Sequence, residues 1–163
     1  MEIRIRQLGD NELEKSAAIV REEIYDTLTI KEMMSWMENG IGSFPFCQHF
    51  VATAEDEEIL GFISWGLYDR LDPELVLEVN WMAVKHNFQR QGIGESLLLV
   101  SLEKVKAYWS QEGLRVRAVM VSTDPSSAGF YRKVLPPPIQ ERRFINVWGD
   151  EEPMIMFCKV FDN

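Results

Sequence analysis

The spacing of hydrophobic residues changes several times along the chain, and each spacing predicts a different kind of element. Residues 2–6 alternate polar and apolar, which predicts a strand. Asp10 then precedes a stripe at helical spacing, so it is expected to cap a first helix. That stripe consists of Leu13, Ala17, Val20 and Ile24. A second helix is expected to open with a capping box, in which Thr29 and Glu32 each bond the other's backbone N–H.

The middle of the chain is rich in predicted strands, and one long helix follows them. Apolar runs predict strands at 50–54, 59–68 and 75–84. Helical spacing over about 94–110 predicts the longest helix, with Gly113 as its C-terminal cap. The remaining expected elements are a strand at 116–121, a short helix opened by Asp124 and Pro125, and closing strands at 144–148 and 154–161 joined by a turn at 149–150.

This order of elements predicts one α/β domain over residues 1–163. The hairpin-like middle favours antiparallel pairing, whereas helical crossovers imply parallel pairing. No repeat, low-complexity tract or linker divides the sequence. We therefore expect a mixed central sheet with helices on both faces.

Composition narrows the classes of function. The chain has 17 Lys and Arg against 26 Asp and Glu, a formal net charge of −9, which disfavours nucleic acid as a partner. The charge would favour a cationic substrate, although a surface charged for solubility explains it as well. Cys47 and Cys158 fit a reduced compartment, and no metal-ligand spacing joins them to His49 or His86, so no metal is expected. Lacking a signal-peptide core and an apolar run long enough for a membrane span, the chain is expected in the cytoplasm, with no membrane partner.

The segment from 84 to 96 has the most specific chemistry. A predicted buried strand runs into a loop containing Gly92 and Gly94, and this loop opens the longest helix. Backbone N–H groups at a helix N-terminus lack partners and can bind a pyrophosphate, to which Arg90 could add a charge. Glycines before a helix also serve in purely structural turns. Neither GxGxxG nor GK[ST] is present, so a dinucleotide fold or NTPase loop is not indicated.

Gln89-x-x-Gly92-x-Gly94, after Met82-Ala83-Val84, resembles the [Q/R]-x-x-G-x-[G/A] motif of the GNAT acyl-CoA N-acyltransferase superfamily. The resemblance implies a GNAT-like fold and an N-acetyltransferase that moves an acetyl group directly from acetyl-CoA to an amine. It also implies that pantetheine lies in a notch beside the strand entering the loop. The coenzyme-binding residues implied are Met82, Val84, Gln89, Arg90, Gln91, Gly92, Ile93, Gly94, Glu95, Ser96 and Asp124. Glu95 would lie close to an anion, so an acid placed at the positive end of the helix dipole is its alternative role.

Residues 124–133 resemble the second signature of this family, in which a Tyr protonates the departing thiolate. Tyr131 occupies that position, and a phenol with a pKa of about 10 can supply the proton. Its alternative role is packing the helix onto the sheet. Asp124 replaces the usual Asn, and the usual Gly-Phe after the helix is missing before Pro136–Pro138. These departures leave the course of the segment and part of the coenzyme site open.

Glu78 is the candidate general base for the amine. It lies six residues before Val84, the spacing of the general-base glutamate in the histone-acetylating branch of the family. Strand alternation predicts that Glu78, Asn80, Met82 and Val84 share one face. A carboxylate on an apolar strand should have a raised pKa. A solvated Glu, or one paired with an Arg, is the alternative.

The amine acceptor is not identified by the sequence. A polyamine, an aminoglycoside, an amino acid and a protein N-terminus all remain open. A stripe of large residues, which would form either the core or an acceptor pocket, consists of Met33, Trp36, Met37, Phe44 and Phe46. The competing class of function is a non-catalytic acyl-CoA-binding or sensing module of the same fold. A homodimer would fit the family.

Overall fold

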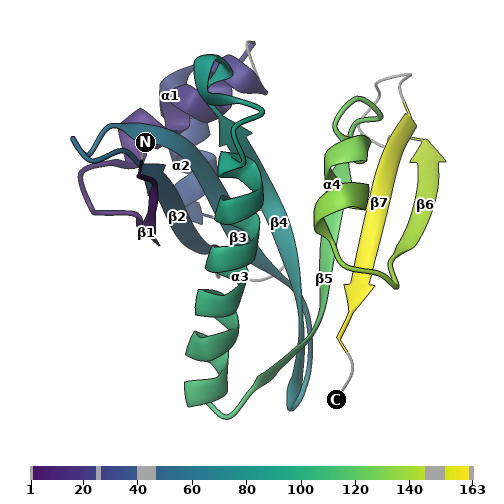
Figure 1. The fold of residues 1–163 in the computed structure, drawn as a ribbon. Helices are drawn as coiled ribbons and strands as arrows, with labels where there is room; N and C mark the ends of the chain where they lie inside the picture. The colour runs from purple at the N-terminus through teal and green to yellow at the C-terminus, as the bar shows by residue number, and fades with distance from the viewer. Residues whose placement is uncertain (1, 25–26, 40–46, 146–152, 162–163) are drawn as a thin grey trace.

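A seven-stranded sheet in the order β1-β2-β3-β4-β5-β7-β6 forms the centre of the molecule (Figure 1). This computed structural model describes residues 2–24, 27–39, 47–145 and 153–161. The strands are β1 (Arg4–Gln7), β2 (Cys47–Thr53), β3 (Ile59–Leu71), β4 (Glu74–Val84), β5 (Arg115–Thr123), β6 (Gln140–Ile145) and β7 (Pro153–Val160). The helices are α1 (Leu13–Glu23), α2 (Ile30–Asn39), the short 3₁₀ helix η1 (His86–Phe88), α3 (Ile93–Gln111) and α4 (Ala128–Val134).

The sheet is mixed, as predicted. β1 to β4 form antiparallel neighbours, and β4 pairs with β5 in parallel after the crossover through α3. The second crossover, through α4, gives no parallel pair among the described strands. β6 runs in the same direction as β5, but β7 lies between them and is antiparallel to both.

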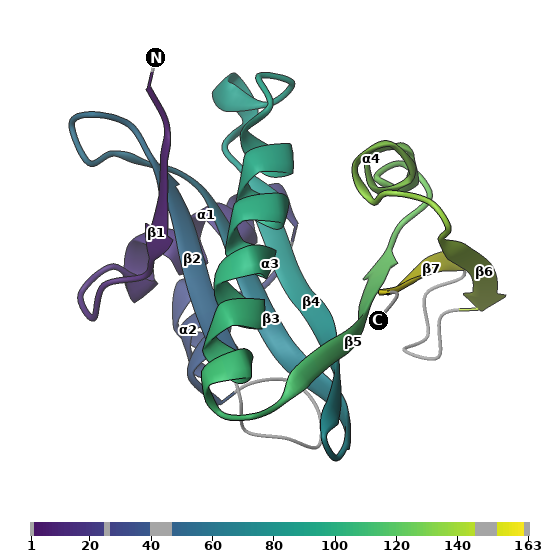
Figure 2. The same ribbon diagram turned by 60° about the horizontal axis from the view of Figure 1, so that its bottom comes forward.

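Helices cover both faces of the sheet, which confirms the predicted fold class (Figure 2). On one face, α1 and α2 pack against apolar residues of β2, β3 and β4, including Val51, Phe62 and Trp81. On the other, α3 and α4 pack over a larger core that includes Trp65 and Phe157. Over the described ranges, no helix has the length and apolar character needed to cross a membrane.

The two helix starts predicted near the N-terminus have different outcomes. The capping box of α2 is confirmed, because Glu32 Oε2 accepts the Thr29 N–H at 2.8 Å and Thr29 Oγ1 accepts the Glu32 N–H at 3.2 Å. Asp10 as the cap of α1 is wrong, since the N-cap is Glu12. The Glu12 carboxylate accepts the Gly9 N–H at 2.8 Å and two bonds of 2.7 Å from Arg6. This ion pair joins the residue before α1 to β1, and the helix begins at Leu13.

The first closing strand differs from its prediction of 144–148. β6 begins earlier, at Gln140, and only Phe144 and Ile145 of the predicted strand belong to it. Residues 146–148 and the predicted turn at 149–150 lie outside the described residues. β6 is an edge strand, and its first side chains are exposed, so they show no alternation of apolar and polar residues. Hydrogen bonding of its backbone to β7 defines the strand instead.

β4 and β5 separate partway along their length, and this separation creates the notch for the site. Their parallel register ends at Val79 opposite Val121. Beyond that point β4 pairs only with β3, while β5 pairs only with β7. Figures 1 and 2 show the two strands diverging toward the start of α3. One edge of each strand is therefore open to a ligand.

A β-bulge at Asn80 changes which face the residues of β4 occupy. Ser64 of β3 pairs with Trp81 and Trp65 pairs with Val79, so Asn80 is the extra residue. Val79 packs with the α3 core and Trp81 with the α1 core. The alternation of side chains is thereby broken in the middle of the strand.

Candidate active site

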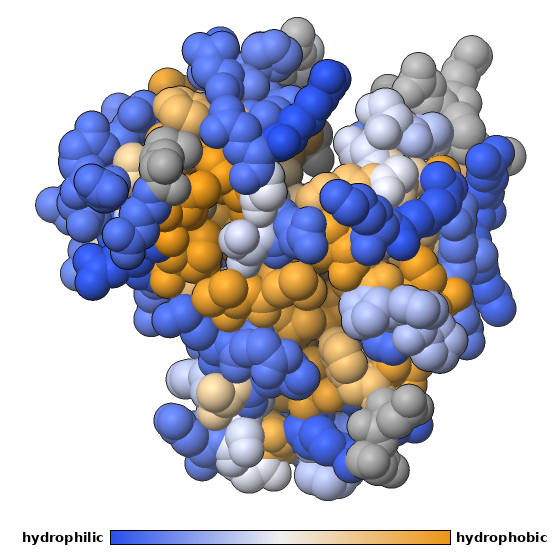
Figure 3. Space-filling model, in the orientation of Figure 1, coloured by the Kyte–Doolittle hydropathy of each residue, from blue (hydrophilic) through white to orange (hydrophobic). Residues whose placement is uncertain are grey.

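A cavity of about 1020 Å³ occupies the notch between β4 and β5. Residues 79–84 of β4 form one wall, and residues of β5 and α4 form the other. The loop before α3 closes one end. Figure 3 shows a band of apolar surface between α3 and the part of the molecule that contains α4, with polar surface at both rims. An extended ligand with an apolar middle and a charged end would fit this distribution.

The loop before α3 presents a row of backbone donors to the cavity. Arg90 has a φ of 59° and Gly92 a φ of 82°, so two residues in a short stretch adopt the left-handed conformation. None of the N–H groups of residues 90–95 has a hydrogen-bond acceptor within the described part of the chain. Strained backbone with free N–H groups at the start of a 19-residue helix is suited to bind an anion.

Glu23, a residue that sequence reasoning missed, holds this loop in place. Its carboxylate accepts the His86 N–H at 2.8 Å and a bond of 2.8 Å from Gln89 Nε2. Gln89 Nε2 also donates to the Val84 carbonyl at 3.0 Å. The side chain of Gln89 therefore fastens the loop to α1 and β4. Glu23 and Gln89 are 66 positions apart, so no local pattern could indicate the contact.

Most of the predicted coenzyme-binding residues meet at the cavity, but not all of them. Those that line it are Met82, Val84, Gln89, Arg90, Gly92, Gly94, Glu95 and Asp124. Three others do not. Ile93 is buried in the core, Gln91 donates its side-chain amide to the Asn87 carbonyl at 3.2 Å, and the exposed Ser96 donates its N–H to the Gly92 carbonyl.

Tyr131 lies on the cavity wall and is otherwise buried, with 6% of its surface exposed. Its ring packs edge-on against Phe130 at 5.0 Å between centroids and lies 5.9 Å from Phe157. Burial first, and the negative charge of Asp124 second, raise the pKa of Tyr131 above its ordinary value. The phenol is therefore protonated at neutral pH and can donate a proton.

Asp124 caps the turn that leads into α4 and does not cap the helix itself. Its Oδ1 accepts the N–H groups of Ser126 at 2.7 Å and Ser127 at 3.0 Å, and α4 begins only at Ala128. Burial opposes its ionisation, but the bonds from the two serines outweigh burial and lower the pKa of Asp124. An ionised aspartate thus lines the cavity where the family signature has Asn.

Glu78 lies near the notch but faces away from the predicted side. Leu77 and Val79 both belong to the core under α3, so Glu78 between them projects toward the face covered by α1 and α2. Met82 and Val84 pack on the α3 side. The prediction that these residues share one face is wrong, because the bulge at Asn80 reverses the alternation. Partial burial raises the pKa of the Glu78 carboxyl.

Asn80 connects the end of the cavity to this second face. It lines the cavity, and its amide lies over Gly66, where an added Cβ would be only 2.7 Å from the amide atoms. Asn80 Nδ2 is 3.6 Å from the sulfur of Cys47. Gly66 is also the register partner of Glu78. The missing side chain of Gly66 thus allows the Asn80 amide to lie flat across β3.

Of the large residues considered for an acceptor pocket, two belong to the core. Met33 and Met37 lie on α2, and their side chains are fully buried in the core between α2 and the sheet. Phe44 and Phe46 and the side chain of Trp36 lie outside what the structure describes. The cavity wall also contains Phe130, whose ring would meet a Cβ at Gly94 at 3.4 Å, so it packs α4 against the start of α3.

Comparisons with known proteins identify the family and show a shared fold. The family model for the acetyltransferase (GNAT) domain matches residues 45–134, from two residues before β2 to the end of α4. The chain belongs to the GNAT acetyltransferase family. No curated protein matches its sequence significantly.

Solved structures of acetyltransferases share the fold along nearly the whole chain. A structure of the NatC complex bound to Gag peptide and CoA has a chain 15% identical, with a TM-score of 0.73 over 99% of this chain and 100% of that one. Aminoglycoside 6'-N-acetyltransferase complexed with coenzyme A is 14% identical, with a TM-score of 0.71 over 98% of each chain. Ribosomal-protein-alanine N-acetyltransferase from Brucella melitensis is 18% identical, with a TM-score of 0.68 over 97% and 99%.

Proposed function

We propose that this protein is an N-acetyltransferase that uses acetyl-CoA and transfers the acetyl group directly to an amine. The observation that carries the proposal is the row of free backbone N–H groups at the start of α3, which opens into the notch between β4 and β5. A pyrophosphate suits that row, and the open edge of β4 suits the amide groups of pantetheine. Membership of the GNAT family supports the same function.

The residues of the loop would bind the coenzyme through backbone groups. Gly92 and Gly94 allow an anion to approach the N–H groups closely, and Arg90 adds a positive charge. Gln89 would act indirectly, since its amide holds the loop to Glu23 and Val84. When bound, acetyl-CoA supplies an activated thioester. The protein positions it and excludes water along an apolar notch.

Glu78 would take the proton from the acceptor amine. A free alkylammonium has a pKa of about 10, so it must lose a proton before it can attack. Glu78 has a raised pKa, which makes its carboxylate a better base than an ordinary one. No described residue forms a hydrogen bond or an ion pair with its carboxylate, and burial is the cause of the raised pKa.

Tyr131 would donate the proton that the departing thiolate requires. Its raised pKa keeps the phenol protonated, and its place among the residues that line the cavity supports this role. The conjugate acid of a free thiolate has a pKa of about 8.5, so the phenol would first stabilise the leaving thiolate by a hydrogen bond, and the coenzyme would depart as the thiol.

A coupled assay of thiol release over a panel of amines tests the proposal. The panel contains a polyamine, an aminoglycoside, free amino acids and peptides with free N-termini, each with acetyl-CoA and with a no-amine control. We expect amine-dependent release of free coenzyme and acetylated product of one class. Stabilisation by acetyl-CoA without thiol release for any amine would instead favour a non-catalytic coenzyme-binding module.

A further inference from the structure

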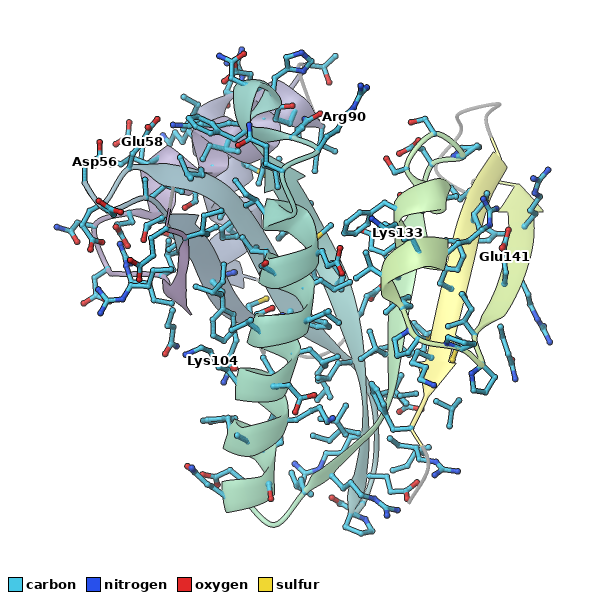
Figure 4. All side chains as sticks on the ribbon, in the orientation of Figure 1. Asp56, Glu58, Arg90, Lys104, Lys133 and Glu141 are labelled. Carbon is cyan, nitrogen blue, oxygen red and sulfur yellow. The ribbon has the colours of Figure 1, made fainter. Side chains whose placement is uncertain are left out.

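Two neighbouring cations on α4 have different surroundings. Arg132 is paired with Glu141 of β6 through bonds of 2.8 and 2.5 Å, and its guanidinium lies 5.8 Å from the centroid of the Phe157 ring. Lys133 lines the coenzyme cavity, and no described residue forms a hydrogen bond or ion pair with its ammonium. Figure 4 shows Lys133 on the side of α4 that faces the notch and Glu141 on the opposite side. The ammonium of Lys133 is therefore free to meet a ligand.

The cavity has few positive charges, so the ammonium of Lys133 matters for binding an anionic ligand. Arg90 and Lys133 are its two cationic side chains among the described residues, and Glu23, Glu95 and Asp124 are also in its wall. The whole chain has a formal net charge of −9. The protein therefore offers no general attraction to a highly anionic coenzyme, so binding must depend on local donors.

Coenzyme A has two separate anionic groups, the pyrophosphate and the 3′-phosphate of its ribose. The loop N–H groups and Arg90 at the start of α3 suit the pyrophosphate. The second group needs a positive charge elsewhere on the cavity. Lys133 provides one from the opposite wall, since Arg90 and Lys133 lie on different sides of the same gap (Figure 4).

We propose that Lys133 binds the 3′-phosphate and makes the protein prefer coenzyme A over its 3′-dephospho form. This inference rests on the proposed function, because it concerns the same coenzyme site. A phosphate monoester is close to a dianion at neutral pH, and a lysine ammonium is a compact point charge that pairs with it without demanding one orientation. Because the site is open to water, the preference should be modest and should weaken with salt.

Binding of two ligands to four proteins tests the proposal. Calorimetry at low ionic strength measures the affinity of coenzyme A and of 3′-dephospho-CoA for the wild type, Lys133→Met, Lys133→Arg and Arg132→Met. The wild type should bind coenzyme A about five- to tenfold more tightly than the dephospho form. Lys133→Met should lose that preference and leave the affinity for 3′-dephospho-CoA unchanged. Lys133→Arg should keep most of it.

Arg132→Met is the matched control, because it removes the same charge from the neighbouring position. It should break the pair with Glu141 and keep the wild-type preference, which excludes a long-range effect of net charge. Equal weakening of both ligands by Lys133→Met would overturn the proposal and assign Lys133 to the pyrophosphate. Equal affinity of the wild type for the two ligands would also overturn it, while leaving the proposed function intact. If the wild type bound neither ligand, the proposed function itself would fail.

Discussion

Tyr131 and Glu78 are the two residues whose proposed roles depend most on their individual surroundings. Tyr131 is buried, packs against the rings of Phe130 and Phe157, and lines the cavity. Glu78 is half-buried on the other face of β4. Burial shifts both pKa values upward, but the chemical consequences differ. It keeps the phenol protonated, as an acid requires, and it strengthens the carboxylate as a base.

Tyr131→Phe removes the hydroxyl and keeps the aromatic packing with Phe130 and Phe157. We expect kcat to fall roughly ten- to a thousandfold, because a general acid is lost. The affinity for acetyl-CoA should barely change, and calorimetry measures it separately. If kcat is unaffected while chemistry limits the rate, Tyr131 only packs α4 onto the sheet.

The pH dependence of the wild type and Glu78→Gln tests the base. The pKa of Glu78 is raised, so more of this carboxyl is protonated and inactive below that value, and kcat/KM should rise as pH passes through it. Glu78→Gln should lose most activity near neutral pH. The loss should shrink at high pH, where more of the amine is already neutral. A loss of equal size at every pH would mean that Glu78 binds the ammonium or supports the strand.

At the scale of elements, the bulge in β4 determines which groups reach the notch. It places Asn80 at the point where β4 loses its partner on β5. Its amide can lie over β3 only because residue 66 is glycine. The bulge thus links the coenzyme cavity to the face on which Glu78 lies.

Gly66→Ala should displace the Asn80 amide, since the new Cβ would lie 2.7 Å from its atoms. We expect activity to fall by up to about a hundredfold, as misplacement in a site allows. The melting temperature should change little, because reduced freedom of the unfolded chain offsets the strain. Gly129→Ala is the control, because its Cβ would meet no atom within 4 Å, and its activity should be unchanged. Wild-type activity in Gly66→Ala would show that the position of the amide does not matter.

At the scale of the whole molecule, the notch separates β4 from β5 over part of their length, and a coenzyme bound there would contact both strands. Acetyl-CoA at a hundred times its Kd should increase the free energy of unfolding by about 2.7 kcal/mol. The melting temperature should rise accordingly. Gly92→Glu should abolish that gain, because the carboxylate would enter the open space beside the loop and repel phosphate.

Gly113→Glu is the matched control for the loop variant. Gly113 has a φ of 74° and open space around its Cβ position, like Gly92, but it lies at the far end of α3. Both variants should lose stability from backbone strain, and differential scanning fluorimetry measures both. Only Gly113→Glu should still be stabilised by acetyl-CoA. A normal ligand response in folded Gly92→Glu would place the phosphate site elsewhere.

Local patterns in the sequence were sufficient to predict most of the fold. The change from alternating to helical spacing located the strands of the mixed sheet, and the glycines before α3 located the loop. Patterns failed where distant residues decide the structure. The N-cap of α1 is Glu12, which Arg6 binds from β1, and not the predicted Asp10. β6 includes polar residues before the predicted strand because their backbone pairs with β7.

The site was predictable only in part, for the same physical reason. Residues 82–95 follow one another along the chain, so their arrangement around the loop follows from local geometry. Asn80 gives no local sign that it forms a bulge, so the faces of Glu78 and Met82 could not be predicted correctly. Glu23, Phe130 and Lys133 reach the cavity only through packing of α1 and α4.

The opposed faces of β4 have a consequence for steady-state kinetics. Glu78 projects toward α1 and α2, whereas the coenzyme notch opens beside Met82 and Val84. An acceptor at Glu78 and a coenzyme in the notch need not displace each other, so both can be bound at once. Double-reciprocal plots at several fixed amine concentrations should therefore intersect, and free coenzyme A should compete with acetyl-CoA but not with the amine. Parallel lines would require an acyl-enzyme formed before the amine binds.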